Sequence, residues 1–151
     1  MDPSPDLAMR RAFVTQLMET AQILRGYVDR RARARGTSRA QWLVLLRLSE
    51  REGLSQVELA TALDLKPISV VPLLDQLVVL GLVERRRGTI DRRTNHLHLT
   101  TAGRATVADL DGLRSEIAQS VLNSANVTDI QLGLDLLLQT KRTLREAQSA
   151  S

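Results

Sequence analysis

Residues 53–103 constrain the fold of this chain more than any other segment. They begin with two short helical patterns, the first of which opens with the capping pair Ser55 and Glu58. Two strand-like runs follow, at residues 82–87 and 93–99, and the residues around Gly88 between them predict a tight turn. The predicted order of helix, helix, strand, turn and strand is that of a winged helix-turn-helix.

Composition supports a mainly helical fold with one small antiparallel hairpin. Apolar residues make up 43% of the 151 residues, but aromatic residues only 2%. The core must therefore consist of Leu, Val, Ile and Ala, which suits packed helices better than a β-sandwich. A net charge of +4 and a sequence pI of about 10.6 favour a polyanionic partner.

Helices are also expected on both sides of the module. Residues 7–33 carry apolar side chains at three- and four-residue steps, which predicts one long helix. The next helix begins after Ser38, with Gln41 as its capping-box partner. After the module, Thr101 is expected to cap one long helix and Thr128 to cap the last.

These flanking helices carry more apolar surface than the compact module between them can cover. We therefore expect segments 7–35 and 101–148 to pack against a second subunit, with residues 38–100 forming the winged module. A chain of this length is expected to form a single domain over residues 1–151.

Several classes of function are excluded by what the chain lacks. It has no cysteine, which excludes disulfides, thiol redox sensing and Cys-based zinc sites. No segment approaches the roughly 20 apolar residues of a membrane span. The polar N-terminus lacks the apolar core of a signal peptide, so we expect a cytoplasmic protein.

Catalysis and metal binding are not expected either. No nucleophile–base pair, paired-carboxylate site or Gly-rich phosphate loop is visible, so we expect no enzymatic activity. His96 and His98 lie two apart on a predicted strand, but no third His or Cys exists to complete a zinc site. We expect no cofactor and no metal. Because the usual partner of a winged helix-turn-helix is duplex DNA, we interpret both histidines as ordinary surface residues or as residues that face DNA.

The second helix of the module, at about residues 67–80, is poor in side chains that read bases. It contains no Lys or Arg, and its only polar side chains are Ser69, Asp75 and Gln76. Base readout depends on bidentate Arg, Asn or Gln contacts, so most of this capacity is missing. The apolar run 78–80 cannot face the core in full, so at least one of its residues must be exposed or covered by a partner.

Pro72 conflicts with a regular helix in this segment. It removes a backbone donor and crowds the carbonyl of Ile68, which costs about 3 kcal/mol in a helix interior. The helix could instead begin late, with Pro72 in its first turn, or bend at that residue. Because Pro67 is itself a good first-turn residue, we favour a helix that begins near Pro67 and is distorted at Pro72.

The turn between the predicted strands is rich in arginine. Five arginines fall within nine residues, and Gly88 permits a tight turn. Guanidinium groups on a protruding hairpin can contact phosphates or enter a narrow minor groove. Strand alternation places Arg85 and Arg87 on one side and Arg86 on the other. The alternative is a solvated charged turn without a partner.

Taken together, these residues resemble the MarR family of bacterial transcription regulators. The similarity lies in Gln-Trp-x-x-Leu from Gln41, Gly-Leu-Val-Glu-Arg-Arg from Gly81, Asp-Arg-Arg from Asp91, and Leu-Thr-x-x-Gly ending at Gly103. It extends over residues 7–146 and implies the element order α-α-α-α-β-β-α-α.

The resemblance also implies how such a protein works. Family members are homodimers built from the N- and C-terminal helices. Each subunit places a recognition helix in the major groove and a wing in the adjacent minor groove of a pseudo-palindromic operator on double-stranded DNA. The resemblance further implies a repressor that a small, often phenolic or aromatic, ligand releases from DNA.

Two sets of candidate site residues follow. By the resemblance, Asp91 pairs with a neighbouring Arg and fixes the shape of the wing, while Arg92 or Arg93 reaches the groove. The candidate DNA-binding residues are Lys66, Ser69, Gln76, Arg85, Arg86, Arg87, Asp91, Arg92, Arg93 and Asn95. The candidate ligand-binding residues are Phe13, Leu17, Trp42 and Leu46, although for Trp42 the favoured interpretation is a core residue.

A second function remains open at this stage. The lack of basic residues in the predicted recognition helix, together with Pro72 and the apolar run 78–80, also fits a winged-helix ligand- or protein-binding module. In such a protein DNA binding would be weakened or lost.

Overall fold

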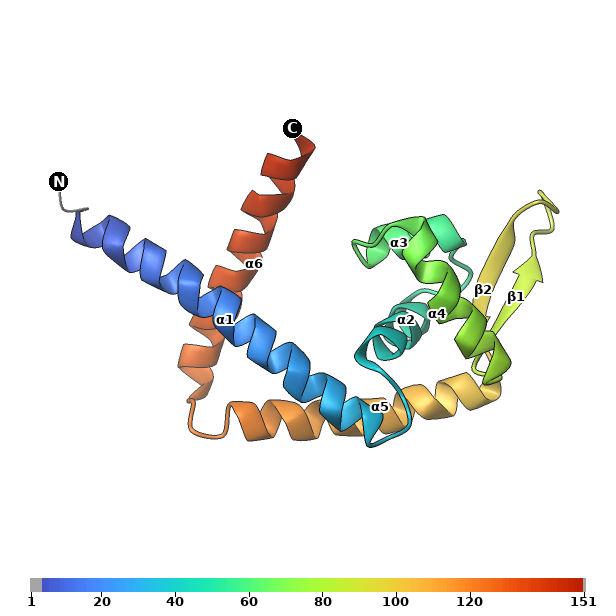
Figure 1. Cartoon of the computed structure of the whole chain (residues 1–151), viewed down its shortest axis with the longest axis horizontal. Coiled ribbons are helices and arrows are strands. Elements are labelled where there is room, and N and C mark those ends of the chain that lie inside the picture. The colour runs from blue at the N-terminus through green and yellow to red at the C-terminus, as the bar shows by residue number, and fades with distance from the viewer. Residues whose placement is uncertain (1–3, 151) are drawn as a thin grey trace. The chain divides into compact units, whose positions relative to one another are not determined.

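The computed structural model describes residues 4–150, so the start of the polar N-terminal leader lies outside the described residues. The elements follow the predicted order of four helices, a two-stranded antiparallel hairpin and two helices (Figure 1). Their bounds are α1 Pro5–Arg33, α2 Arg39–Glu50, α3 Gln56–Ala62, α4 Pro67–Val79, β1 Val83–Arg87, β2 Asn95–Leu99, α5 Thr101–Val121 and α6 Val127–Ser149. The fold is a winged helix-turn-helix with long helices before and after it.

The chain divides into two compact units, Met1–Ser115 and Glu116–Ser151. The first contains α1 to α4, the hairpin and most of α5, and the second contains the end of α5 and α6. Among the described residues, no helix is both long enough and apolar enough to cross a membrane.

Leucines form the core of the first unit. Leu45 and Leu48 of α2, Leu74 and Leu77 of α4, and Leu97 of β2 are all buried. From α5, Leu110 and Leu113 are likewise buried. The prediction of an aliphatic core packed between helices is confirmed, and it fixes α4 and the hairpin on one framework.

Side-chain caps define where the helices begin. Both predicted capping boxes are present, Ser38 with Gln41 and Ser55 with Glu58. Hydrogen bonds with Ser55 lower the pKa of the Glu58 carboxyl, and the bond from the backbone N–H of Ser55 has the largest effect.

Two predicted caps are wrong by one or two residues. The hydroxyl of Thr100, rather than Thr101, accepts from the backbone N–H of Gly103 at 3.0 Å. For α6 the cap is Asn126 rather than Thr128, because its Oδ1 accepts from the backbone N–H of Asp129 at 2.8 Å.

Helix α4 begins at Pro67 and continues through Pro72 to Val79. The alternative of a late start at Pro72 is therefore wrong. Lys66 precedes the helix without a side-chain cap. Since α4 has neither a cap nor an uninterrupted set of backbone donors, burial of residues such as Val70, Leu74 and Leu77 must hold it in place.

Helix α4 ends at Val79, close to the expected end at about residue 80. Gly81 adopts a φ of 72°, and the N–H of Leu82 donates to the carbonyl of Leu77 at 2.9 Å, which closes the last turn. Val79 is 86% exposed and Leu80 is 56% exposed. The expectation that part of the apolar run 78–80 stays uncovered is confirmed within this chain.

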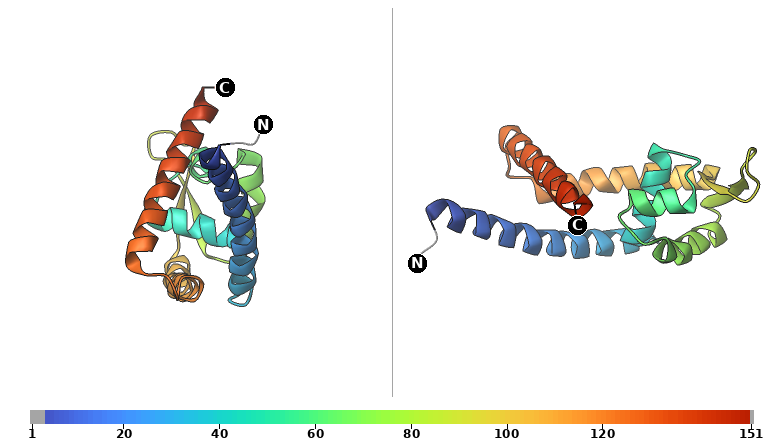
Figure 2. Two further views of the ribbon diagram at one scale, coloured as in Figure 1. Left: turned by 90° about the vertical axis from the view of Figure 1, so that its left-hand side faces the viewer. Right: turned by 90° about the horizontal axis from the view of Figure 1, so that it is seen from above.

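The hairpin pairs Val83 with Leu99 at its base and Arg87 with Asn95 near its tip. The N–H of Leu97 donates to the carbonyl of Leu54 at 2.9 Å, so the segment before α3 extends the sheet by one bridge. The tip projects beyond α3 and α4 (Figures 1 and 2).

The predicted strand 93–99 starts two residues too early. Residues 93 and 94 belong to the turn, because the N–H of Arg93 donates to the carboxylate of Asp91 at 2.9 Å and the N–H of Thr94 donates to its carbonyl at 3.3 Å.

Candidate nucleic-acid interface

Asp91 closes the tip of the hairpin through backbone contacts. Its Oδ1 accepts from the N–H of Arg93 and its carbonyl accepts from the hydroxyl of Thr94, both at 2.9 Å. The pairing of Asp91 with an arginine side chain, which the family resemblance implied, is not seen among the described residues. Because an Asx turn requires only a carboxylate and a nearby N–H, it leaves the neighbouring guanidinium groups available.

Gly88 is required at the other side of this turn. A Cβ atom there would lie 2.6 Å from the carbonyl oxygen of Asp91 and 2.9 Å from Oγ1 of Thr94. The backbone is therefore closely packed at this side of the turn, between Arg87 and Arg92.

The five arginines of the hairpin differ in their partners. Arg85 donates to Asp75 of α4 at 2.6 Å, and Arg86 donates to Glu84 two residues earlier on the same strand face. The predicted alternation is thus confirmed for Arg85 and Arg86. Within the part of the chain that the structure describes, Arg87, Arg92 and Arg93 have no side-chain hydrogen bond or ion pair. These three guanidinium groups are available to phosphates.

The remaining candidate DNA-binding residues lie apart from the tip. Lys66 and Ser69 are exposed at the N-terminal end of α4. Ser69 lies six residues before Asp75, or about 9 Å along the helix axis. Gln76 is not free, because its Oε1 accepts from Nε2 of Gln41 at 3.1 Å. Asn95 is exposed opposite Arg87.

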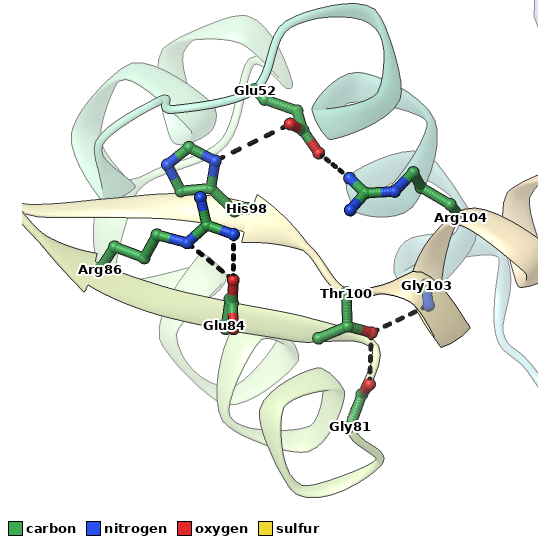
Figure 3. Close-up of polar contacts among 8 residues, drawn as sticks. All are labelled: Glu52, Gly81, Glu84, Arg86, His98, Thr100, Gly103 and Arg104. Atoms are coloured by element: carbon green, nitrogen blue, oxygen red, sulfur yellow. Dashed lines mark hydrogen bonds and ion pairs between the residues drawn. The ribbon is translucent and has the colours of Figure 1, made fainter.

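Tertiary contacts fix the base of the hairpin on the helices (Figure 3). The hydroxyl of Thr100 donates to the carbonyl of Gly81 at 2.5 Å. A Cβ atom at Gly103 would lie only 2.0 Å from the carbonyl oxygen of Leu82, so only glycine fits where α5 crosses the start of β1. These contacts make Thr100 and Gly103 a structural strand-to-helix junction.

The two histidines face the loop before α3. Nδ1 of His96 lies 2.9 Å from the carbonyl oxygen of Gly53. Glu52 lies between His98, 3.8 Å from one carboxylate oxygen, and Arg104, 2.8 Å from the other (Figure 3). Among the described residues no group of three or more His, Cys, Asp or Glu could hold a metal ion. His96 thus connects β2 to the loop before α3.

A pocket of about 400 Å³ lies between α1 and α2. Two of the candidate ligand-binding residues, Trp42 and Leu46, line it together with Ala21, Leu24 and Val28 of α1. Trp42 is only 5% exposed, so it belongs both to the core and to the pocket wall. Its Nε1 is buried without a hydrogen-bond partner among the described residues.

Phe13 and Leu17 do not line this pocket. Phe13 is 43% exposed and lies two turns before the first α1 residue of the wall. Ligand binding by these two residues therefore stays a prediction, and this pocket does not support it, because only the C-terminal half of α1 lines the pocket. Helical periodicity selects the correct face of α1 but not the point along the helix at which another helix crosses it.

Three arginines that the sequence pattern did not indicate also line the pocket. Arg25, Arg39 and Arg114 come from α1, α2 and α5, and no Asp or Glu lines the same pocket. The start of α2 is fixed by Asp29, which accepts from the N–H of Arg39 at 3.1 Å and from the side chain of Arg33 at 2.8 Å. Both hydrogen bonds hold the pKa of the Asp29 carboxyl below its usual value, and the bond from the Arg33 side chain has the larger effect.

Comparison with known proteins gives a consistent result. The MarR family model matches residues 37–94. The solved transcriptional regulator PA3341 is 32% identical, with 89% of this chain and 98% of that chain covered and a TM-score of 0.78.

Two other solved structures show similar folds. The MarR family transcription regulator SP03579 is 18% identical over 97% of both chains, with a TM-score of 0.86. CouR from Rhodococcus jostii RHA1, solved with p-coumaroyl-CoA bound, is 25% identical with a TM-score of 0.71. That comparison covers 80% of this chain and 85% of CouR.

Proposed function

The chain belongs to the MarR family of transcription regulators, and from this premise we propose that it is a homodimeric, DNA-binding repressor that a small anionic ligand releases. The observation that carries the DNA-binding proposal is the hairpin. Arg87, Arg92 and Arg93 stand unpaired, among the described residues, on a turn fixed by Asp91 and Gly88. Such a group of guanidinium charges suits phosphate contacts beside a groove.

A homodimer is proposed because both terminal helices have uncovered apolar side chains. In α1, Met9, Met18 and Ile23 are each at least 70% exposed. In α6 no described residue is buried, although the helix contains Leu132 and Leu134. Apolar faces of this length are usually covered by a partner, and a second copy of the chain covers segments 7–35 and 101–148 in the proposed assembly.

Binding to promoter DNA is expected to depend steeply on salt. Three unpaired arginines per subunit give six in a dimer, and each phosphate contact contributes about 0.9 to the slope of log affinity against log salt. Affinity should therefore fall about a thousandfold between about 50 and 200 mM salt. A mobility-shift titration on the chain's own promoter at both salt concentrations measures this fall.

The result at low salt also separates the two candidate functions. Absence of any specific shift at the lower concentration would sink the DNA-binding proposal. It would favour a winged-helix module that binds ligands or proteins, for which the lack of Lys and Arg in α4 is the supporting observation.

The pocket between α1 and α2 is proposed to bind the ligand. Its wall is mostly apolar, Trp42 provides an aromatic surface, and Arg25, Arg39 and Arg114 supply positive charge. This combination fits a flat apolar body that carries a carboxylate or phosphate. CouR, which has a similar fold, is seen with an aromatic acyl-CoA, p-coumaroyl-CoA.

An aromatic acid that occupies this pocket is expected to raise the melting temperature. A ligand present at 100 times its Kd adds about 2.7 kcal/mol of stability, or roughly 5–10 °C for a chain of this size. A thermal-shift screen with aromatic carboxylic acids measures the effect.

Two variants locate the ligand within the chain. Arg39→Ala should remove most of the shift, whereas Arg10→Ala, which alters a distant surface ion pair with Asp6, should keep it. The ligand assignment fails if both variants respond like the unchanged protein, or if none of the acids stabilises it.

A further inference from the structure

The uncovered face of α4 is mainly apolar. Ile68 is 78% exposed and Val79 is 86% exposed, whereas Val70, Leu74 and Leu77 on the opposite side are fully buried. With 3.6 residues per turn, positions 68, 72, 75 and 79 lie in one row along the helix. Pro72 in this row is also exposed. Three of the four residues in the row therefore present only carbon atoms to a partner.

The single acid of α4 is neutralised within the chain. Asp75 lies in the exposed row, and its carboxylate accepts from the guanidinium of Arg85 at 2.6 Å. An unpaired carboxylate at this place would repel the phosphates of an approaching duplex. The ion pair removes that repulsion and joins the hairpin to the exposed face of α4.

The other polar side chains of α4 discriminate bases poorly. Oε1 of Gln76 is bonded to Gln41, which hinders the two-point contact that a free Gln makes with adenine. Ser69 carries a single hydroxyl, which accepts or donates and so fits several bases. Polar readout by this helix is therefore weak, and any sequence preference that α4 contributes must come mainly from its apolar row.

Only one apolar group is offered by base pairs in the major groove, the C5 methyl of thymine. We propose that Ile68, with Pro72 and Val79 in the same row, reads thymine methyl groups, so that the operator is recognised through apolar contact. This inference rests on the proposed function, because it requires α4 to enter the major groove. Ile68 lies in the first turn of α4, the end of a recognition helix that contacts base edges.

Continuity with the hairpin favours DNA over a protein as the partner of this face. The Asp75–Arg85 ion pair sets the hairpin beside α4, and the unpaired Arg87, Arg92 and Arg93 lie further along the same hairpin. An apolar row next to a basic hairpin matches a groove with methyl groups on its floor and phosphates along its edge. A protein partner would need an acidic rim around an apolar centre.

The test begins with duplexes selected from a random-sequence library by the full-length protein. A recovered site is then synthesised with deoxyuridine in place of thymidine, which removes only the C5 methyl groups. Affinity is expected to fall about fourfold for each contacted methyl, and about 15-fold for a symmetric pair in the two half-sites. Fluorescence anisotropy with both duplexes measures the ratio.

Variants separate methyl contact from a change in DNA shape. In Ile68→Ser and Val79→Ser, which leave no methyl group at these positions, the ratio of thymidine to deoxyuridine affinity should fall towards one. In Val57→Ser, the same type of change at an exposed position of α3, this ratio should keep its full value. If thymidine and deoxyuridine duplexes bind equally, or if every variant keeps the full penalty, methyl readout is overturned while DNA binding stands. If no duplex is enriched and none binds, the proposed function fails as well.

Discussion

Replacing both Arg92 and Arg93 with alanine is expected to lower DNA affinity by about two to three orders of magnitude at physiological salt. Each substitution removes one unpaired guanidinium per subunit, so a dimer loses four of its six proposed phosphate contacts. The slope of log affinity against log salt should correspondingly fall from about 5 to about 2. Anisotropy titrations at four or more salt concentrations give both the affinity and the slope.

The adjacent pair Arg10 and Arg11 in α1 provides the matched control. Replacing both with alanine changes the net charge by the same amount but leaves the hairpin intact. Because α1 belongs to the proposed dimer interface, size-exclusion chromatography must first show that this variant is still a dimer; we then expect it to keep nearly the full affinity and slope. Equal losses in the two double variants would mean that overall charge, rather than the hairpin, attracts DNA, and the interface proposed here would be wrong.

The features that followed from sequence are those fixed by local chemistry. Capping boxes at Ser38 and Ser55 and the glycine end of α4 depend on residues within a few positions of one another. The leucine core follows from helical periodicity in the same way. The order of elements, and hence the winged helix, could therefore be predicted without tertiary information.

The features that did not follow depend on packing between distant segments. Nothing in the spacing of Asp75 and Arg85 indicates that the hairpin folds back onto α4, yet their ion pair decides which arginines stay free. Because of the point at which α1 crosses α2, the pocket is lined by Ala21, Leu24 and Val28 and not by Phe13 or Leu17. Arg114 joins that pocket from α5, about 70 residues beyond Trp42 in sequence.

Pro72→Ala is expected to stabilise the protein by about 2–3 kcal/mol, because the structure places this proline inside α4 rather than at its start. The substitution restores the N–H that donates to the carbonyl of Ile68. The side chain at position 72 is exposed, so little packing is lost. For a chain of this size the melting temperature should rise by roughly 5–10 °C, which differential scanning calorimetry measures.

Pro67 is the matched control, because it occupies the first position of the same helix. Its missing N–H has no helical partner in any case, so Pro67→Ala should change stability by less than about 1 kcal/mol. Similar changes from both substitutions would show that α4 accommodates Pro72 without cost.

Pro72→Arg tests whether the proline inside α4 also affects DNA binding. Arginine also restores the backbone donor, and it adds a cation to the exposed row of α4, so we expect higher DNA affinity and a salt slope steeper by about 2 per dimer. Because polar contacts would then replace the apolar ones, the preference for thymidine over deoxyuridine should weaken at the same time. A collapse of DNA binding in a stably folded Pro72→Arg protein would instead show that the proline shapes the surface by which α4 fits the groove.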